Sequence, residues 1–183
     1  MTRTVRHDHV PLWRVGARSW TDPLDAAFSR DRPDNRWNTS AFPALYCCCS
    51  LRVARAVVED RWRRLSVDLA DLTPDARPEL AEIDWAGLVV DVASREGLEA
   101  HGFPPDYPAG VDRADCRRAA AAWHDAGCEG VVCRSAALYR LGRETRWEGD
   151  HAAWGEVAVF TARAERKPVL RRRREDLGWL TRS

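Results

Sequence analysis

Nine tryptophans are spread along almost the whole chain, from Trp13 to Trp179. Because the indole ring is large and mostly apolar, this residue is typical of packed structure and scarce in disordered segments. The spread therefore predicts that nearly all of the 183 residues fold. A chain of this length can bury one substantial core. Since the sequence also has no internal repeats or low-complexity tracts, we expect a single domain over residues 1–183.

The balance of charge excludes a general attraction to polyanions. Lysine and arginine together number 29, aspartate and glutamate number 28, and the net charge is +1 at pH 7. Without a strong positive field, we expect no direct binding of nucleic acid, and any anion must be bound locally. No stretch approaches the roughly 20 apolar residues that cross a bilayer, and the N-terminus lacks the apolar segment of a signal peptide. We therefore expect a cytoplasmic protein with no membrane contact.

The cysteines predict neither a disulfide framework nor a metal site. A cytoplasmic chain with a proper core normally keeps its thiols reduced, so we interpret all six as small apolar side chains. They are Cys47, Cys48, Cys49, Cys116, Cys128 and Cys133. The first three are consecutive, and the last two are not spaced like paired zinc knuckles. We therefore expect no bound metal.

Hydrophobic patterning predicts a mixture of short strands and helices. Strands are expected at residues 10–15, 44–49, 66–72, 87–92, 130–133 and 156–160, and helices at 22–28, 51–64 and 113–126. Residues 169–180 are expected to form a strand and a short helix, with the four arginines at 171–174 interpreted as a solvated helix face. Because strands and helices do not alternate as in a doubly wound fold, the predicted fold class is α+β with a mixed, largely antiparallel sheet.

Three residues in the first third of the chain could bind an anionic, aromatic ligand. Arg14 lies on a predicted strand among apolar neighbours, and its planar guanidinium can donate two parallel hydrogen bonds to a diphosphate or carboxylate. Arg36 directly precedes Trp37 and Asn38, which supply a flat apolar surface and an amide. Tyr46, on the next predicted strand, can stack on an aromatic ring. Each also has an ordinary structural explanation: an ion-paired arginine, a surface loop and a core tyrosine with a bonded hydroxyl.

Two acidic residues and one serine complete the candidates. Glu59 lies four residues from both Arg55 and Arg63, at the spacing of a salt-bridge ladder along a helix. Asp60 follows it, and because either carboxylate can reach a cleft, the choice between them stays open. Ser135 follows a predicted strand, where its hydroxyl can contact a ligand or cap a short helix. No Gly-x-Ser-x-Gly motif surrounds it, which argues against a serine hydrolase.

Taken in order, these segments resemble the RES domain family, which is named for arginine, glutamate and serine positions. The resemblance covers about residues 10–162 and rests on the ordered series rather than on one motif. The matching segments are Leu12-Trp13-Arg14-Val15, Arg36-Trp37-Asn38, Pro43-Ala44-Leu45-Tyr46, the helix after Ser50, Gly127 to Ala136, and Gly155 to Phe160. The resemblance implies a fold similar to that of ADP-ribosyltransferases.

The resemblance also implies a function, because characterised members of this family degrade NAD by hydrolysis or phosphorolysis and are blocked by an Xre-like antitoxin. We therefore expect the toxin of a toxin–antitoxin pair: an NAD glycohydrolase or NAD phosphorylase that takes NAD as substrate and water or phosphate as acceptor. Two alternatives stay open, an ADP-ribosyltransferase that modifies a protein target and a catalytically degenerate protein that only binds a nucleotide or a partner. Homo-oligomerisation also stays open.

Carried over position by position, the resemblance gives the candidates their roles. Arg14 and Arg36 would hold the phosphates or ribose of NAD. Tyr46 would pack on the nicotinamide side, and Ser135 would complete the pocket. We therefore expect these four side chains, distant along the chain, to meet around one dinucleotide.

The resemblance also places the family glutamate on the helix that follows Tyr46. Its usual register falls near Val57, which leaves Glu59 or Asp60 as the acid that stabilises an oxocarbenium-like state. Together with Arg14 and Ser135, Glu59 is then the candidate for catalysis.

Overall fold

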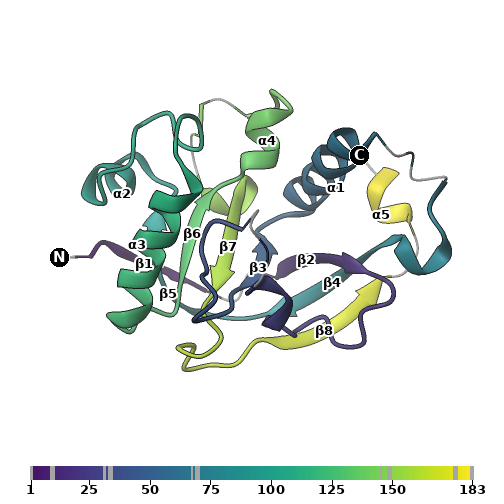
Figure 1. Ribbon diagram of the computed structural model, residues 1–183, viewed down its shortest axis with the longest axis horizontal. Helices are drawn as coiled ribbons and strands as arrows, with labels where there is room; N and C mark the ends of the chain where they lie inside the picture. Colours follow the sequence, from purple (N-terminus) through teal and green to yellow (C-terminus); the bar gives the residue numbers. More distant parts are fainter. Residues whose placement is uncertain are drawn as a thin grey trace.

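The computed structural model describes residues 2–8, 11–30, 32, 35–66, 68, 71–144, 146–147, 150–174 and 177–181. Its strands are β1 (Thr4–His7), β2 (Leu12–Ala17), β3 (Leu45–Cys48), β4 (Pro78–Asp84), β5 (Gly87–Val92), β6 (Gly130–Arg134), β7 (Gly155–Val159) and β8 (Val169–Arg174). Its α-helices are α1 (Leu51–Leu65), α2 (Arg95–Ala100), α3 (Arg113–Asp125), α4 (Ala136–Arg140) and α5 (Gly178–Thr181). The eight strands join in one sheet, so the fold is α+β (Figure 1).

The sheet has the strand order β1-β5-β6-β7-β3-β2-β4-β8. Strands β5 and β6 pair in parallel, because α2 and α3 connect them and return the chain to the same end of the sheet. The other described neighbours pair antiparallel. This arrangement confirms the predicted mixed, largely antiparallel sheet.

Two apolar clusters fill the interior. One contains Val90, Leu98 and Trp123 and joins α2 and α3 to β5, β6 and β7. The other contains Val53 and Val58 and joins α1 to β2, β3 and β4. In Figure 1, α2 and α3 accordingly lie at one end of the molecule and α1 and α5 at the other.

The tryptophans are packed throughout. Six of the nine are buried, and Trp20, Trp62 and Trp147 are partly buried. Trp13 on β2 is 8% exposed and Trp179 on α5 is 2% exposed. Packing therefore extends from near the start of the chain to near its end, as the tryptophan spread predicts, while the assignment of the whole chain to one domain stays a prediction.

Several predicted elements are confirmed together with the residues that define their ends. Ser50 caps α1, because its Oγ accepts a hydrogen bond from the Val53 N–H at 3.3 Å. Helix α3 is followed by Gly127, whose φ of 84° lies in the left-handed region that favours glycine. The first predicted strand is β2, and Val10 lies outside the described residues.

All six cysteines are free, and all but Cys128 are buried.

The helix predicted at residues 22–28 is wrong. Asp22 accepts a hydrogen bond from the Leu24 N–H at 2.7 Å, so its side chain closes a turn instead of capping a helix. A short 3-10 helix, Ala27–Ser29, follows this turn. The proline that favours a first helical turn is equally compatible with a β-turn, which is what forms here.

The strand predicted at residues 66–72 is also wrong for the part that the structure describes. Ser66 takes the left-handed conformation with φ of 52° and ends α1. Asp71 has a 3-10 helical conformation and Leu72 lies in a bend. Val67, Leu69 and Ala70 lie outside the described residues.

The arginines at 171–174 lie on strand β8, so the predicted solvated helix face is wrong. Strand β8 pairs with β4, which supplies the acidic partners: Asp84 for Arg171, Glu82 for Arg172 and Glu79 for Arg173. Opposite charges on adjacent strands stabilise the pairing. The predicted closing strand and short helix are present as β8 and α5.

Candidate active site

A pocket of about 190 Å³, named here the Arg36 pocket, is lined by α1, α4, the loop before β3 and the middle of the sheet. Its lining residues are Asn35, Arg36, Trp37, Tyr46, Val57, Asp60, Arg61, Arg64, Arg113, Cys133, Ala136, Ala137, Arg140 and Glu156. Five of these side chains are arginines and two are acids, so the pocket is suited to an anionic ligand.

Strand register and helix periodicity bring these residues together. Glu156 on β7 pairs with Cys48 on β3 and with Cys133 on β6, and directly paired residues lie on one face of a sheet. Tyr46, two residues before Cys48, shares that face. Helix α1 contributes one side, with positions spaced by three, four and seven residues: Val57, Asp60, Arg61 and Arg64.

The hydroxyl of Tyr46 holds the loop that carries Arg36. It accepts a hydrogen bond from the Trp37 N–H and donates one to Asn38 Oδ1, each at 2.8 Å. Asn38 Nδ2 donates in turn to the Ser29 carbonyl at 2.7 Å. Burial raises the pKa of Tyr46, so the hydroxyl stays protonated and can donate at neutral pH. Tyr46 therefore holds the backbone N–H of Trp37 and the side chain of Asn38.

The guanidinium of Arg36 is partly buried and lines the pocket. Within the part of the chain that the structure describes, it makes no hydrogen bond and no ion pair. Burial by itself lowers the pKa of Arg36, but the surrounding Tyr107, Cys133 and Glu156 raise it above its ordinary value. This cation can therefore bind an anion without first breaking a contact with the protein.

Ser135 lies behind the pocket wall and is fully buried. Its Oγ accepts a hydrogen bond from the Leu138 N–H at 3.3 Å, which caps α4, and its hydroxyl is also hydrogen-bonded to the Glu156 carboxylate. Burial raises the pKa of Glu156, while the Ser135 hydrogen bond and the charge of Arg36 offset part of the rise. Ser135 thus both begins α4 and orients a carboxylate that lines the pocket.

Asp60 enters the Arg36 pocket from α1, and its buried carboxylate pairs with the more exposed Arg140. Arg140 donates from Nε to Oδ1 at 2.8 Å and from Nη2 to Oδ2 at 2.7 Å. Arg64 Nη2 lies 3.2 Å from the same Oδ2. This bidentate pair ties α4 to α1 and balances the charge of Asp60.

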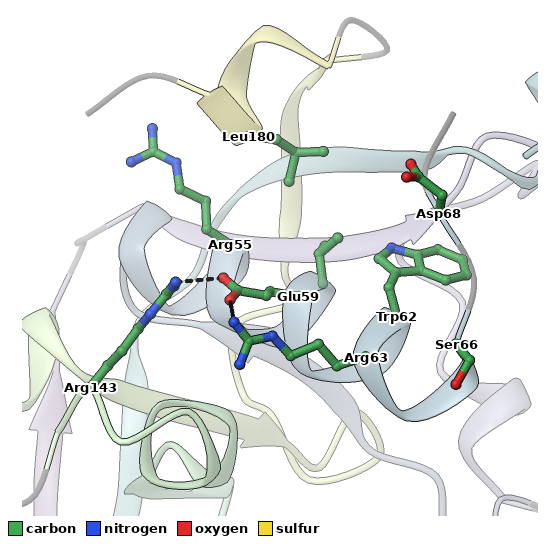
Figure 2. A pocket seen from close by; sticks show the side chains of 9 residues that line it. Arg55, Glu59, Trp62, Arg63, Ser66, Asp68, Arg143 and Leu180 are labelled. Carbon is green, nitrogen blue, oxygen red and sulfur yellow. Dashed lines mark ion pairs between the residues drawn. The ribbon is translucent and has the colours of Figure 1, made fainter. Parts of the chain in front are cut away.

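Glu59 lies in a different pocket, on the other side of α1 (Figure 2). That pocket has a volume of about 610 Å³ and includes Trp62 and Leu180 among its lining residues. Glu59 lies 2.8 Å from Arg63 and 2.7 Å from Arg143, the two ion pairs drawn in Figure 2. The predicted ion pair with Arg63 is therefore present, and the structure does not bring Glu59 to Arg36.

Arg14 lies on the opposite face of the sheet. Trp13 pairs with Cys48 and so shares the face of the Arg36 pocket, which turns the neighbouring Arg14 away from it. Arg14 Nη2 donates to the Asp25 carbonyl at 2.9 Å, and its guanidinium lies 4.9 Å from the centre of the Trp20 ring. Of the candidates predicted from sequence, the structure brings together Arg36, Tyr46, Asp60 and Ser135.

Comparison with known proteins identifies the family. The family model described as the RES domain matches residues 11–179. The chain belongs to the RES domain family. A chain in the crystal structure of the M. tuberculosis MbcT–MbcA toxin–antitoxin complex has a similar fold, with a TM-score of 0.72 and 22% sequence identity, over 93% of this chain and 85% of that chain. A comparison with curated proteins found no match.

Sequence reasoning missed several charged residues of the pocket in this RES domain, and two of them, Glu156 and Arg140, contact other candidate residues. Glu156 did give a signal, because it is the one charged residue in the strand Gly155–Val159, which is otherwise apolar. An acid in such a strand is either paired or functional. Arg140 gave none, since an arginine in the last turn of a short helix is typical of an exposed position.

Among the described residues, no group of three or more histidine, cysteine, aspartate or glutamate side chains is arranged to hold a metal ion. No described helix is both long and apolar enough to span a membrane.

Proposed function

We propose that this RES domain is the toxin of a toxin–antitoxin pair, that it acts in the cytoplasm, and that it degrades NAD bound in the Arg36 pocket. One observation carries the proposal: Arg36 is partly buried, has no ion pair among the described residues, and lies in a pocket with four further arginines. A planar guanidinium donates two parallel hydrogen bonds to phosphate oxygens. The pocket therefore suits the diphosphate of a dinucleotide.

The size of the pocket suggests how NAD would lie. A volume of about 190 Å³ is smaller than the roughly 300–1,000 Å³ of most small-molecule sites. We infer that the nicotinamide ribose enters the pocket and that the diphosphate lies at its mouth, beside Arg36. The adenosine would then lie outside, near the exposed arginines Arg61, Arg64 and Arg113.

The proposed reaction breaks the bond between nicotinamide and ribose, after which water or phosphate captures the ribosyl carbon. A carboxylate in the pocket would stabilise the positive charge that develops on the ribose. Of the two acids proposed from sequence, Asp60 lines the pocket whereas Glu59 lies on the other side of α1. Arg14 takes no part in this proposal, because its guanidinium packs on Trp20.

The proposed partner is an Xre-like antitoxin that blocks the pocket. Support comes from family membership and from the fold shared with a chain of a toxin–antitoxin complex. Co-expression with the product of a neighbouring helix-turn-helix gene should give a co-purifying complex that no longer consumes NAD.

The direct test incubates the purified protein with NAD, with and without phosphate, and follows nicotinamide release by chromatography. Hydrolysis yields ADP-ribose, and phosphorolysis yields its 1″-phosphate. Arg36→Ala should weaken NAD binding, whereas Arg118→Ala on the exposed face of α3 should not. Absence of NAD loss in both buffers would falsify the proposal, and binding without turnover would favour a degenerate protein. Label transferred from NAD to cell protein would favour an ADP-ribosyltransferase.

A further inference from the structure

Two carboxylates line the Arg36 pocket, and their surroundings differ. Asp60 is held by Arg140 through both of its oxygens and is also paired with Arg64. Glu156 has no arginine within ion-pair distance in the described part of the chain, and its hydrogen-bond partner is the neutral hydroxyl of Ser135. The negative charge of Asp60 is thus balanced at contact distance, whereas that of Glu156 is not.

The backbone holds Glu156 in a fixed position. Strand β7 is hydrogen-bonded on both sides, to β3 and to β6, and Glu156 is paired in both ladders. Close packing continues at Gly155, where an added Cβ would lie 2.7 Å from the His151 carbonyl oxygen. A side chain on such a central strand can be placed more accurately than one on a loop.

We propose that Glu156 is the catalytic carboxylate of this RES domain and that it lies beside the ribose C1′ of bound NAD. The inference rests on the proposed function and adds to it the residue that acts on the substrate. Three features carry it: Glu156 lines the same pocket as Arg36, its charge is not balanced by an ion pair, and Ser135 orients it. Val57, which lines the pocket from α1, carries no charge.

In the proposed hydrolysis, water is the second reactant. The bond between ribose C1′ and the nicotinamide nitrogen breaks, and nicotinamide leaves as a neutral molecule with the bonding electron pair. The Glu156 carboxylate stabilises the positive charge on C1′ and then accepts a proton from the water that bonds to C1′. NAD⁺ and water thus give ADP-ribose, nicotinamide and one proton, which Glu156 releases to solvent. Phosphate in place of water gives ADP-ribose 1″-phosphate.

The surroundings of Glu156 predict a pH dependence. The titratable groups that influence its carboxylate come from several elements: Arg36, Tyr46, Cys48, Cys49, Asp60, Tyr107, Cys133 and Arg140. Burial raises the pKa of Cys133 to about 12 and the pKa values of Cys48 and Cys49 well above their usual range, so none of these thiols ionises near neutral pH. Burial also raises the pKa of Glu156. Since the ionised form acts, kcat should rise with pH through this raised pKa and level off above it.

The test compares two isosteric variants in the nicotinamide-release assay. Glu156→Gln should lower kcat by about 100-fold or more, remove the acidic limb of the pH profile and leave the Kd for NAD, measured by calorimetry, nearly unchanged. Asp60→Asn should lower kcat by less than about tenfold, because its charge is already balanced. Glu99→Gln on α2, an exposed side chain away from the pocket, serves as the control and should match the wild type.

The outcomes separate this inference from the proposed function. A wild-type protein that releases no nicotinamide overturns both. An active wild type whose Glu156→Gln variant keeps kcat within about tenfold overturns only the role of Glu156. If Glu156→Gln does not fold, as judged by circular dichroism, Glu156→Asp decides: a lowered kcat with a retained acidic limb supports the inference, and an unchanged kcat overturns it.

Discussion

Replacing Tyr46 by phenylalanine tests whether one hydroxyl holds the Arg36 loop. The substitution removes two hydrogen bonds of 2.8 Å and leaves the Trp37 N–H and Asn38 Oδ1 without their partner. Trp37 and Asn38 are each 2% exposed, so water reaches these atoms poorly. A buried polar group without a partner costs about 1–3 kcal/mol. Asn38 keeps its hydrogen bond to Ser29, and Tyr46 borders the pocket. We therefore expect each unpaired atom to cost near the lower end of this range, so the free energy of unfolding should fall by about 2 kcal/mol in total.

Urea denaturation followed by tryptophan fluorescence measures this loss, and thermal unfolding should show a fall in Tm of roughly 4–8 °C for a chain of this size. Tyr139→Phe is the matched control, because Tyr139 is 38% exposed and its hydroxyl makes no hydrogen bond within the described residues. NAD binding should weaken for Tyr46→Phe and not for the control. A Tyr46→Phe variant within about 0.5 kcal/mol of the wild type would refute the reasoning, since the loop would then be held by other contacts.

Further perturbations test the ion pair on α4, the backbone packing at two glycines and the burial of the cysteines. Arg140→Lys removes the pair of parallel hydrogen bonds to Asp60 and should lower the free energy of unfolding by about 1 kcal/mol, a value reduced because Arg140 is partly exposed. Urea titration measures this change, and Arg118→Lys, in an exposed ion pair, is the control that should show none. Gly130→Ala places a Cβ 2.6 Å from a backbone oxygen of β7 and should cost about 1–3 kcal/mol. At Gly102, an added Cβ meets nothing within 4 Å, so Gly102→Ala should lower the free energy of unfolding by only about 1–2 kcal/mol, the strain of a left-handed conformation. A loss of stability larger for Gly102→Ala than for Gly130→Ala would contradict the geometry. A thiol reagent should modify Cys128 first, because the other five cysteines are buried, and uniform labelling would contradict that burial.

The elements that could be predicted from sequence are those with strong local signals. Helix α1 begins with a serine cap, α3 ends at a glycine, and β3, β5, β6 and β7 are short apolar runs. Strand β1 has no such signal, because Thr4–His7 is largely polar and becomes a strand only by pairing with the distant β5. Strand β4 likewise begins at Pro78 and is held between β2 and β8. Long-range pairing of this kind is not visible in a local pattern.

The candidate site was predictable in part for the same reason. Tyr46 lies on an apolar strand whose alternation can be read directly, and Arg36 precedes it by a short loop. The face of Arg14 depends instead on which residue pairs with Trp13, which only the register decides. Glu59 and Asp60 are neighbours on α1, so the helix turns them to different sides, and only the packing of α4 against α1 determines which side is the pocket.

Helix α4 connects the walls of the Arg36 pocket, although it has only five residues. Ser135 caps it and is hydrogen-bonded to Glu156, while Arg140 at its other end holds Asp60 on α1. A helix this short has little stability of its own and depends on its cap and on tertiary contacts. Loss of the Ser135 hydroxyl would therefore release the helix start and the orientation of Glu156 together. Substitutions at these positions should for that reason combine non-additively, because each acts on the same short helix.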